Sequence, residues 1–287
     1  MTPRNLADFL AEDIGTLPCW IDPFILPKRG ILLFGGEAKA SKSFFMMEMA
    51  RALSTGTVMF GNGAFRVTEQ SRVLLVDQEV GEYGLHKRLK RIFARHNPSM
   101  YRDHFAFLTQ QPEWRFDTQQ GREHILKTIN EFKPNVVMLD PIARFHGGEE
   151  QSSTEIGNLF REIYKMMQLG AVENMSVVIS HHFRKPPTGR NRDDYNPLDP
   201  YNFRGSSEWF GVPDTIMTLN RLPSPVKDRW TVQAGFRLRH GEEPPDMEFI
   251  VTPESNTATV TFGRYLTPPG VTFMTPPPKA GGGLVRL

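Results

Sequence analysis

The sequence contains a single cysteine, Cys19, among its 287 residues. One cysteine excludes an intramolecular disulfide, and chains without disulfides are typical of a reducing compartment. Long apolar runs are missing as well, because no stretch approaches the roughly 18 residues that span a bilayer. Residues 1–15 carry acidic side chains and lack the apolar stretch of a secretory signal. We therefore expect a soluble cytoplasmic protein that makes no membrane contact.

An excess of charge of either sign is also lacking, because 34 lysines and arginines stand against 32 aspartates and glutamates and leave a net charge of +2. The overall charge therefore does not indicate nucleic-acid binding, and any surface of that kind has to be a local patch. Hydrophobic residues make up 39% of the chain, which is enough for a sizeable core.

Apolar runs of strand type alternate with amphipathic segments along most of the chain. The first strands are predicted at 31–34, 72–76, 105–108, 136–139 and 176–179, and the helices between them at 44–53, 83–96, 122–132 and 153–169. This alternation predicts an α/β fold with a doubly wound, mostly parallel sheet. Strands at 214–219, 230–238, 248–252 and 258–262 follow with short connections, which predicts antiparallel strands added at the C-terminal edge.

The composition divides the chain into three parts. Residues 1–28 are predicted to form a helix and an extended arm, 29–265 the core, and 266–287 a flexible tail rich in proline and glycine. Trp20 and Phe24 in the arm pack on the active site or a neighbouring subunit in one interpretation, and cover the sheet edge in the other.

The first strand of the core leads through an eight-residue loop into a helix, and the loop reads Gly36-Glu37-Ala38-Lys39-Ala40-Ser41-Lys42-Ser43. A loop in this context is typical of phosphate binding, with backbone N–H groups and the helix N-terminus around a triphosphate. We expect ATP here, with Lys42 on the β- and γ-phosphates, Ser43 on Mg²⁺ and Phe44 completing the contacts. Ser41 replaces the usual second glycine. A positive φ at Ser41 would cost about 1–2 kcal/mol in backbone strain. The alternative is a plain turn before an amphipathic helix.

Carboxylates follow two of the predicted strands. Asp140 ends the run 136–139, where a parallel strand meets the ligand edge of the sheet, and is a predicted Mg²⁺ ligand. Asp77 and Glu79 follow the run 72–76 and share one side if the strand continues. Glu79 is the predicted base that orients the attacking water, with Asp77 as the second choice. The alternative for this pair is a helix N-cap or an ion pair with Lys87 or Arg88.

His181 and His182 end a third apolar run. Polar groups at this edge can contact the γ-phosphate and transmit its loss to the next loop. A metal site is disfavoured, because adjacent histidines do not easily share one ion. Simple capping of the strand end is the alternative.

The order of these motifs resembles the RecA-like core of RepA-type hexameric helicases, which are close to the DnaB branch. The motifs are the phosphate loop, Val-Asp-Gln-Glu at 76–79, Leu-Asp-Pro-Ile-Ala-Arg-Phe-His at 139–146, His-His-Phe-Arg-Lys at 181–185 and Arg-Gly-Ser-Ser at 204–207. The resemblance covers residues 17–252. It implies a catalytic role for Glu79, a nucleotide-sensing role for His182, and a role for Arg204 as a finger that reaches the nucleotide of the neighbouring subunit.

Two further basic features fit the same resemblance. Arg237 and Arg239 share one face of a predicted strand and are competing finger candidates, since no arginine near the phosphate loop offers itself within the same chain. The loop 183–203 is predicted to bind single-stranded DNA, with cations on phosphates and aromatic rings on bases. Its cations are Arg184, Lys185, Arg190 and Arg192, and its aromatic residues are Tyr195, Tyr201 and Phe203. A solvated strand and a solvated loop are the respective alternatives.

Together these features predict a Mg²⁺-dependent ATPase of the RecA-like class that forms a homo-oligomeric, most simply hexameric, ring and translocates on single-stranded DNA in replication. A filament-forming recombination or repair ATPase is the alternative within the same enzyme class. A nucleotide-switched assembly or loading module with weak turnover is the alternative that Ser41 favours.

Overall fold

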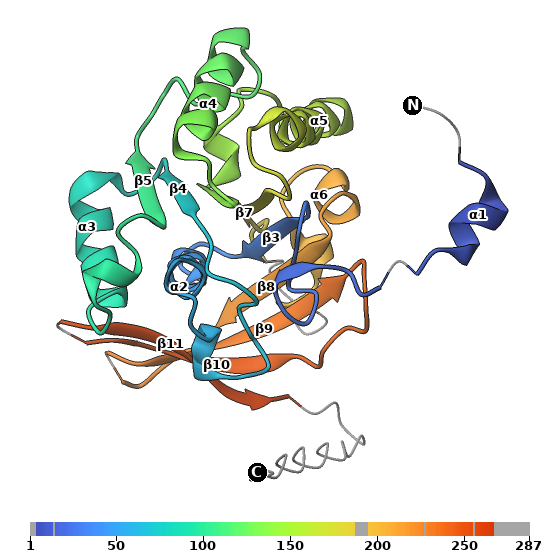
Figure 1. Ribbon diagram of the computed structural model, residues 1–287. Helices are drawn as coiled ribbons and strands as arrows, with labels where there is room; N and C mark the ends of the chain where they lie inside the picture. Colours follow the sequence, from blue (N-terminus) through green and yellow to red (C-terminus); the bar gives the residue numbers. More distant parts are fainter. Residues whose placement is uncertain (1–3, 14, 187–194, 227, 255, 267–287) are drawn as a thin grey trace, which may run out of the picture.

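The computed structural model describes residues 4–13, 15–186, 195–226, 228–254 and 256–266. Within them, one sheet of nine strands runs in the order β11-β10-β9-β8-β3-β7-β6-β4-β5 (Figure 1). The strands are β3 (Ile31–Gly36), β4 (Val73–Asp77), β5 (Phe105–Thr109), β6 (Val136–Asp140), β7 (Ser176–His182), β8 (Thr215–Arg221), β9 (Trp230–Leu238), β10 (Met247–Pro253) and β11 (Ala258–Tyr265). The strands β8, β3, β7, β6, β4 and β5 are parallel to one another. Strands β9, β10 and β11 are antiparallel additions beside β8. The predicted fold class is confirmed.

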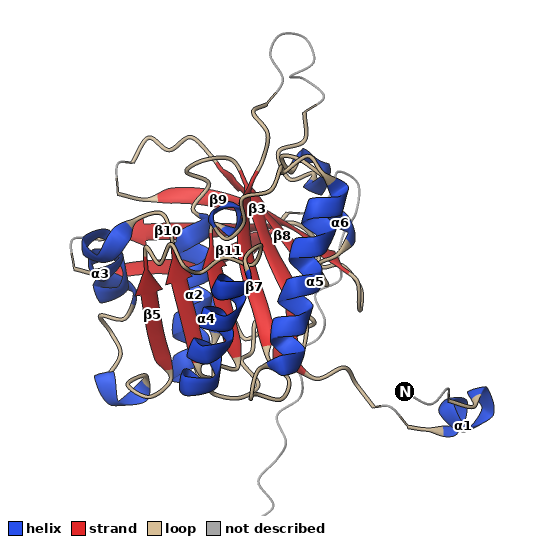
Figure 2. Ribbon diagram, turned by 90° about the horizontal axis from the view of Figure 1, so that it is seen from above, coloured by secondary structure: helices blue, strands red, loops and turns tan. Residues whose placement is uncertain are grey.

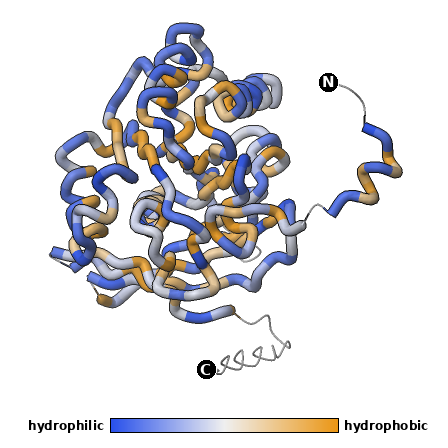
Figure 3. Tube along the Cα trace, viewed as in Figure 1, coloured by the Kyte–Doolittle hydropathy of each residue, from blue (hydrophilic) through white to orange (hydrophobic). Residues whose placement is uncertain are grey.

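Helices cover both faces of the parallel part. The helices are α2 (Lys42–Thr55), α3 (Gly81–Ile92), α4 (Gln119–Phe132), α5 (Ser153–Leu169) and the short α6 (Glu208–Gly211), and 3₁₀ turns lie at Met59–Gly61, Pro98–Met100, Ile142–Arg144 and Pro200–Asn202. Helices α2 and α3 share one core with Leu32 and Phe34, whereas α4 and α5 share the other with Ile31 and Leu33. Successive residues of a strand point to opposite faces, so an unbroken apolar strand serves both cores. Figure 3 shows these hydrophobic stretches gathered in the middle of the molecule.

The antiparallel strands belong to the same core as α2. Phe45 of α2 lies 5.3 Å from the ring of Phe249 in β10 and 5.3 Å from that of Phe60. All three rings are buried. This aromatic packing fixes β10 against the helix that begins at the phosphate loop.

The N-terminal residues form an exposed helix followed by a buried hairpin. A short antiparallel pair, β1 (Cys19–Ile21) and β2 (Leu26–Pro27), is buried, and the Trp20 indole donates a hydrogen bond of 3.0 Å to Ser176 Oγ. The segment predicted as an extended arm is therefore a hairpin in the core. By contrast, α1 (Leu6–Ala11) has no buried residue and lies away from the rest of the molecule (Figures 1 and 2).

None of the helices in the described residues is long and apolar enough to cross a membrane. The predicted tail lies outside the described residues from 267 onward.

Candidate active site

The phosphate loop connects β3 directly to α2, as predicted. A Cβ on Gly36 would lie 2.5 Å from the carbonyl oxygen of Leu219, so the neighbouring strand β8 requires glycine there. Ser41 has φ 76°, in the left-handed region, at a cost of about 1–2 kcal/mol for a residue with a side chain. The predicted strain at Ser41 is thus present, and the Ser41 hydroxyl accepts a hydrogen bond from the Trp230 indole.

Lys42 folds back over the loop that precedes it. Its Nζ donates hydrogen bonds of 2.9 Å to the carbonyl oxygens of Gly36 and Glu37, and it lies 3.1 Å from Nδ1 of His182. Burial lowers the pKa of Lys42 to about 8, although Asp140 and Glu79 oppose the shift. The ammonium is therefore held at the mouth of the loop by acceptors that phosphate oxygens can replace, because charged acceptors form the stronger hydrogen bonds.

The predicted Mg²⁺ ligands meet across two elements. Ser43 Oγ at the start of α2 donates a hydrogen bond of 2.7 Å to Asp140 Oδ2 at the end of β6, and Ser180 donates to the other oxygen of the same carboxylate. The described residues contain no cluster of three or more metal-ligating side chains. A single carboxylate and a hydroxyl suit Mg²⁺, which keeps several waters and takes further ligands from substrate phosphates. The residues present therefore fit the predicted ion.

Asp77 and Glu79 do not share a side, which corrects the sequence-based expectation. Strand β4 ends at Asp77, and Oδ1 of this buried carboxylate accepts from the backbone N–H groups of Glu79 and Val80 at 2.9 and 2.7 Å. Burial raises the pKa of Asp77. Asp77 therefore holds the turn, and the exposed Glu79 is the carboxylate that lines the cavity at the phosphate loop.

That cavity has a volume of about 400 Å³. Its lining includes residues 38–44 of the loop together with Glu79, Arg88, Asp140, His182, Arg221 and Trp230. Two arginines thus face the loop within the same chain, contrary to the expectation from the sequence. Both come from segments that gave no motif signal.

Arg221 and Trp230 form a layered pair beside the loop. The Arg221 guanidinium carbon lies 4.0 Å from the centre of the Trp230 ring, and the Trp230 indole N–H donates a hydrogen bond of 2.8 Å to Ser41 Oγ. The ring of Phe44 meets that of Trp230 edge-on at 6.0 Å. Arg221 reaches this position because Leu219, two residues before it, pairs with Gly36 of β3, and this pairing leaves no motif in the sequence.

The two histidines point to different places. His182 faces Lys42, and burial followed by the Lys42 charge lowers its pKa. His181 is 1% exposed, stacks on Trp209 at 4.2 Å, and its Nε2 donates to the Arg204 carbonyl oxygen at 2.9 Å. Burial lowers the pKa of His181 to about 4, so the ring is neutral. His182 is thus placed to meet phosphate, whereas His181 anchors the segment that carries Arg204.

The three predicted finger arginines lie outside the cavity of their own chain. Arg204 Nε is 3.0 Å from Glu150 Oε2, and its side chain is 69% exposed. Arg237 pairs with Glu243 at 3.2 Å, and Arg239 donates to the Gly211 carbonyl oxygen. All three side chains are at the surface of the subunit.

The described part of the predicted DNA loop is anchored next to the phosphate loop. Arg184 donates a hydrogen bond of 2.8 Å to the Tyr201 carbonyl oxygen. The Tyr195 hydroxyl lies 3.4 Å from a carboxylate oxygen of Glu37. Burial and the Glu37 carboxylate raise the pKa of Tyr195 to about 12. Phe203 is buried against Gly35, which removes it from the predicted base-stacking set. Lys185 and the Tyr201 ring are exposed. Arg190 and Arg192 lie outside the described residues.

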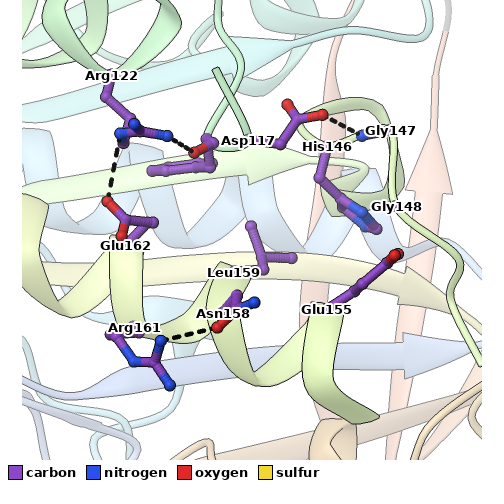
Figure 4. Close-up of a pocket in the computed structure, with 11 residues that line it drawn as sticks. Asp117, Arg122, His146, Gly147, Gly148, Glu155, Asn158, Leu159, Arg161 and Glu162 are labelled. Carbon is purple, nitrogen blue, oxygen red and sulfur yellow. Dashed lines mark hydrogen bonds and ion pairs between the residues drawn. The ribbon is translucent and has the colours of Figure 1, made fainter. Parts of the chain in front are cut away.

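A larger cavity of about 560 Å³ lies elsewhere, between α4, α5 and the segment after β6 (Figure 4). Several of its charged groups have partners. Arg122 lies 3.4 Å from Glu162, and Asp117 accepts from the Gly147 N–H at 2.9 Å. It contains neither a lysine nor the phosphate loop. Although this cavity is the larger of the two, it therefore lacks the groups that a nucleotide site needs.

Comparison with known proteins agrees with this geometry. The model of a family described as an AAA domain matches residues 5–188, more than half of the chain. The matched part contains the phosphate loop, Glu79, Asp140 and His182, whereas Arg204 and everything after it lie beyond. None of the curated proteins matches the chain.

Proposed function

The chain belongs to the AAA domain family of P-loop ATPases, and from this premise we propose that it is a replicative helicase that assembles as a hexameric ring and translocates on single-stranded DNA. The observation that carries the proposal is the convergence of Lys42, His182 and the Ser43–Asp140 pair at one edge of the sheet. Each of these groups comes from a different strand end or from the loop itself.

In this mechanism, the chain's own residues position the phosphates and the water. Lys42 exchanges its two carbonyl partners for the β- and γ-phosphate oxygens. Ser43 and Asp140 are the residues that would hold Mg²⁺, which when bound neutralises phosphate charge. Glu79 orients the attacking water and accepts its proton. His182, in contact with Lys42, responds to the γ-phosphate and passes its loss to the loop that begins at Phe183.

Assembly of a ring is supported by three arginines that lie outside the pocket of their own subunit. Arg204, Arg237 and Arg239 lie at the surface, where an arginine can reach the pocket of a neighbour. In addition, α1 exposes Leu6, Leu10 and part of Phe9. A six-residue helix with no buried side chain gains little stability on its own, so a second copy of the chain is its proposed partner.

The proposed docking site for α1 is a groove of about 200 Å³ between α4 and α5 of the second copy. Its floor is apolar, and its lining includes Ile125, Leu126, Met166 and Leu169. The charged side chains of its lining are Arg122 and Lys165, both paired with Glu162, and Glu123, so the apolar side chains supply the proposed contact. Leu169 is 65% exposed in one subunit, which suits a surface that becomes covered on assembly.

ATPase rates with and without single-stranded DNA test the proposal. The wild type should hydrolyse ATP faster with DNA, and Lys42→Ala should not bind nucleotide. Glu79→Gln should bind ATP and lose about 10²–10⁴ in turnover, the usual contribution of a general base. Glu82→Gln, an exposed carboxylate in the first turn of α3, is the matched control. Near-normal turnover in Glu79→Gln would assign the base elsewhere.

Two further outcomes separate the alternatives. Hydrolysis stimulated by DNA without ATP-dependent duplex unwinding would favour a filament-forming recombination or repair ATPase. Nucleotide-dependent assembly with negligible turnover would favour a switched loading module, which is the alternative supported by the positive φ of Ser41.

A further inference from the structure

We propose that Arg221 and Trp230 form the subsite that holds the base of the nucleotide, and that Ser41 ties this subsite to the phosphate loop. The inference rests on the proposed nucleotide site and adds the recognition of the part of the ligand that no phosphate-binding residue contacts.

Sheet order places the two ends of the nucleotide on opposite sides of β3. Asp140 on β6 and Glu79 beyond β4 lie to one side, so the γ-phosphate points that way. Arg221 on β8 and Trp230 on β9 lie to the other side, and both line the same cavity as the loop. Adjacent strands are about 4.8 Å apart, so β9 lies roughly 10 Å from β3. The base is the remaining part of the ligand that extends to this side.

The chemistry of the pair suits a flat aromatic ring. Trp230 is 8% exposed, with one face covered by the Arg221 guanidinium and Phe44 packed edge-on against it. Arg221 itself is exposed, so the outer face of its planar guanidinium is free to stack. A base laid there completes a stack of base, guanidinium and indole. Stacking uses the face that all bases share, and the larger purines cover more of it.

Ser41 gives this subsite a direct connection to the phosphates. The indole N–H can only donate, and this buried donor has the Ser41 hydroxyl as its acceptor at 2.8 Å. Glycine, the usual residue at this loop position, would leave the N–H without that partner. The departure from the usual pattern therefore has a structural reason: a strained backbone at Ser41 is held by the residue that backs the base subsite.

Binding of ATP and of inorganic triphosphate, compared by calorimetry, tests the base subsite. Arg221→Ala should weaken ATP binding about fivefold to a hundredfold, the usual effect of losing a stacking partner. Triphosphate affinity should stay within about twofold. Arg221→Lys, which keeps the charge and loses the plane, should behave like Arg221→Ala. Arg229→Ala, an exposed arginine in the same hairpin, is the matched control.

The contrary outcomes are distinct. Equal losses for ATP and triphosphate would make Arg221 a phosphate ligand and overturn the base subsite. Unchanged ATP affinity in Arg221→Ala would overturn it as well. A wild type that binds neither ligand would overturn the proposed nucleotide site itself, and the subsite with it.

The connection that the hydrogen bond between Trp230 and Ser41 makes to the phosphate loop has its own test. Trp230→Phe keeps a stacking ring and removes the N–H, so it should weaken triphosphate binding in the wild-type background and leave it unchanged in the Ser41→Gly background. Thermal melting of each variant checks that it is folded. An equal effect in both backgrounds, or none in either, would overturn the tie while leaving the result for Arg221 in place.

Discussion

Lys42 lies in a site that makes its charge conditional on pH. Burial lowers its pKa to about 8, and a bound triphosphate raises it again, because opposite charge favours the protonated form. Nucleotide affinity is therefore fully present below pH 8 and is lost as the pH rises toward the pKa of the bound state.

We predict that triphosphate affinity falls above pH 8 by up to about tenfold per pH unit, with uptake of one proton on binding. Calorimetry in buffers of different ionisation enthalpy measures that uptake. Lys42→Arg keeps its charge at any of these pH values, so it should lose the pH dependence if it still binds. A wild-type affinity that stays flat to pH 10 would contradict a lowered pKa for Lys42.

Much of the site was predictable at the residue scale, because strand ends in a parallel sheet gather at one edge. That rule brings Lys42, Asp140 and His182 together without any knowledge of the packing. The same rule does not predict Arg221 and Trp230, because their position depends on the pairing of β8 with β3 and of β9 with β8. Such non-local pairing leaves no periodic signal in the sequence.

At the scale of elements, the predicted order of strands and helices agrees with the structure where apolar periodicity is strong. Three short elements, β1, β2 and α6, were missed for physical reasons. The hairpin of β1 and β2 has strands too short to show a period, yet its side chains are buried by the surrounding core. The single-turn α6 is held by the stacking of Trp209 on His181, which is a tertiary contact.

The exposed helix α1 carries a prediction about assembly. Replacing Leu6 and Leu10 by serine should dissociate the proposed oligomer, because each leucine buried at the interface contributes about 2 kcal/mol. Leu169→Asp in the proposed groove should have the same effect, and all three side chains are exposed in one subunit, so folding is preserved. Light scattering coupled to size exclusion gives the mass. Asp13→Ala, at an exposed position just beyond this helix, is the control, and assembly unaffected by the leucine changes would assign α1 another role.

The loop after β7 carries a prediction about DNA. Replacing Arg184, Lys185, Arg190 and Arg192 by alanine should weaken single-strand binding and reduce its salt dependence by about 0.7 in slope for each lost phosphate contact. Titrations at several salt concentrations measure the slope. Lys90→Ala, a cation of α3, is the control. An unchanged slope in the fourfold variant would locate the DNA path elsewhere.

At the scale of the whole molecule, the distribution of arginines decides whether one subunit has a complete site. Arg88 and Arg221 line the pocket in cis, so the subunit is not devoid of positive charge there. Arg204 is different, because its backbone is fixed by His181 and by a close approach of Gly205 to Glu150. A Cβ on Gly205 would lie 2.1 Å from the Glu150 carbonyl oxygen. Arg204 is thus held on a rigid support at the surface, outside the lining of its own pocket.

Mixing two inactive variants tests whether the site is shared. Arg204→Ala should bind ATP and lose about 10³–10⁵ in turnover, which is the contribution of an arginine supplied by a neighbour. Lys42→Ala subunits keep the finger and lose the pocket, whereas Arg204→Ala subunits keep the pocket and lose the finger. A mixed ring contains interfaces that join an intact pocket to an intact finger, so activity should partly return. If neither this mixture nor the equivalent one with Arg239→Ala regains activity despite confirmed co-assembly, these arginines do not act across the interface, and Arg88 or Arg221 must supply the charge within the same subunit.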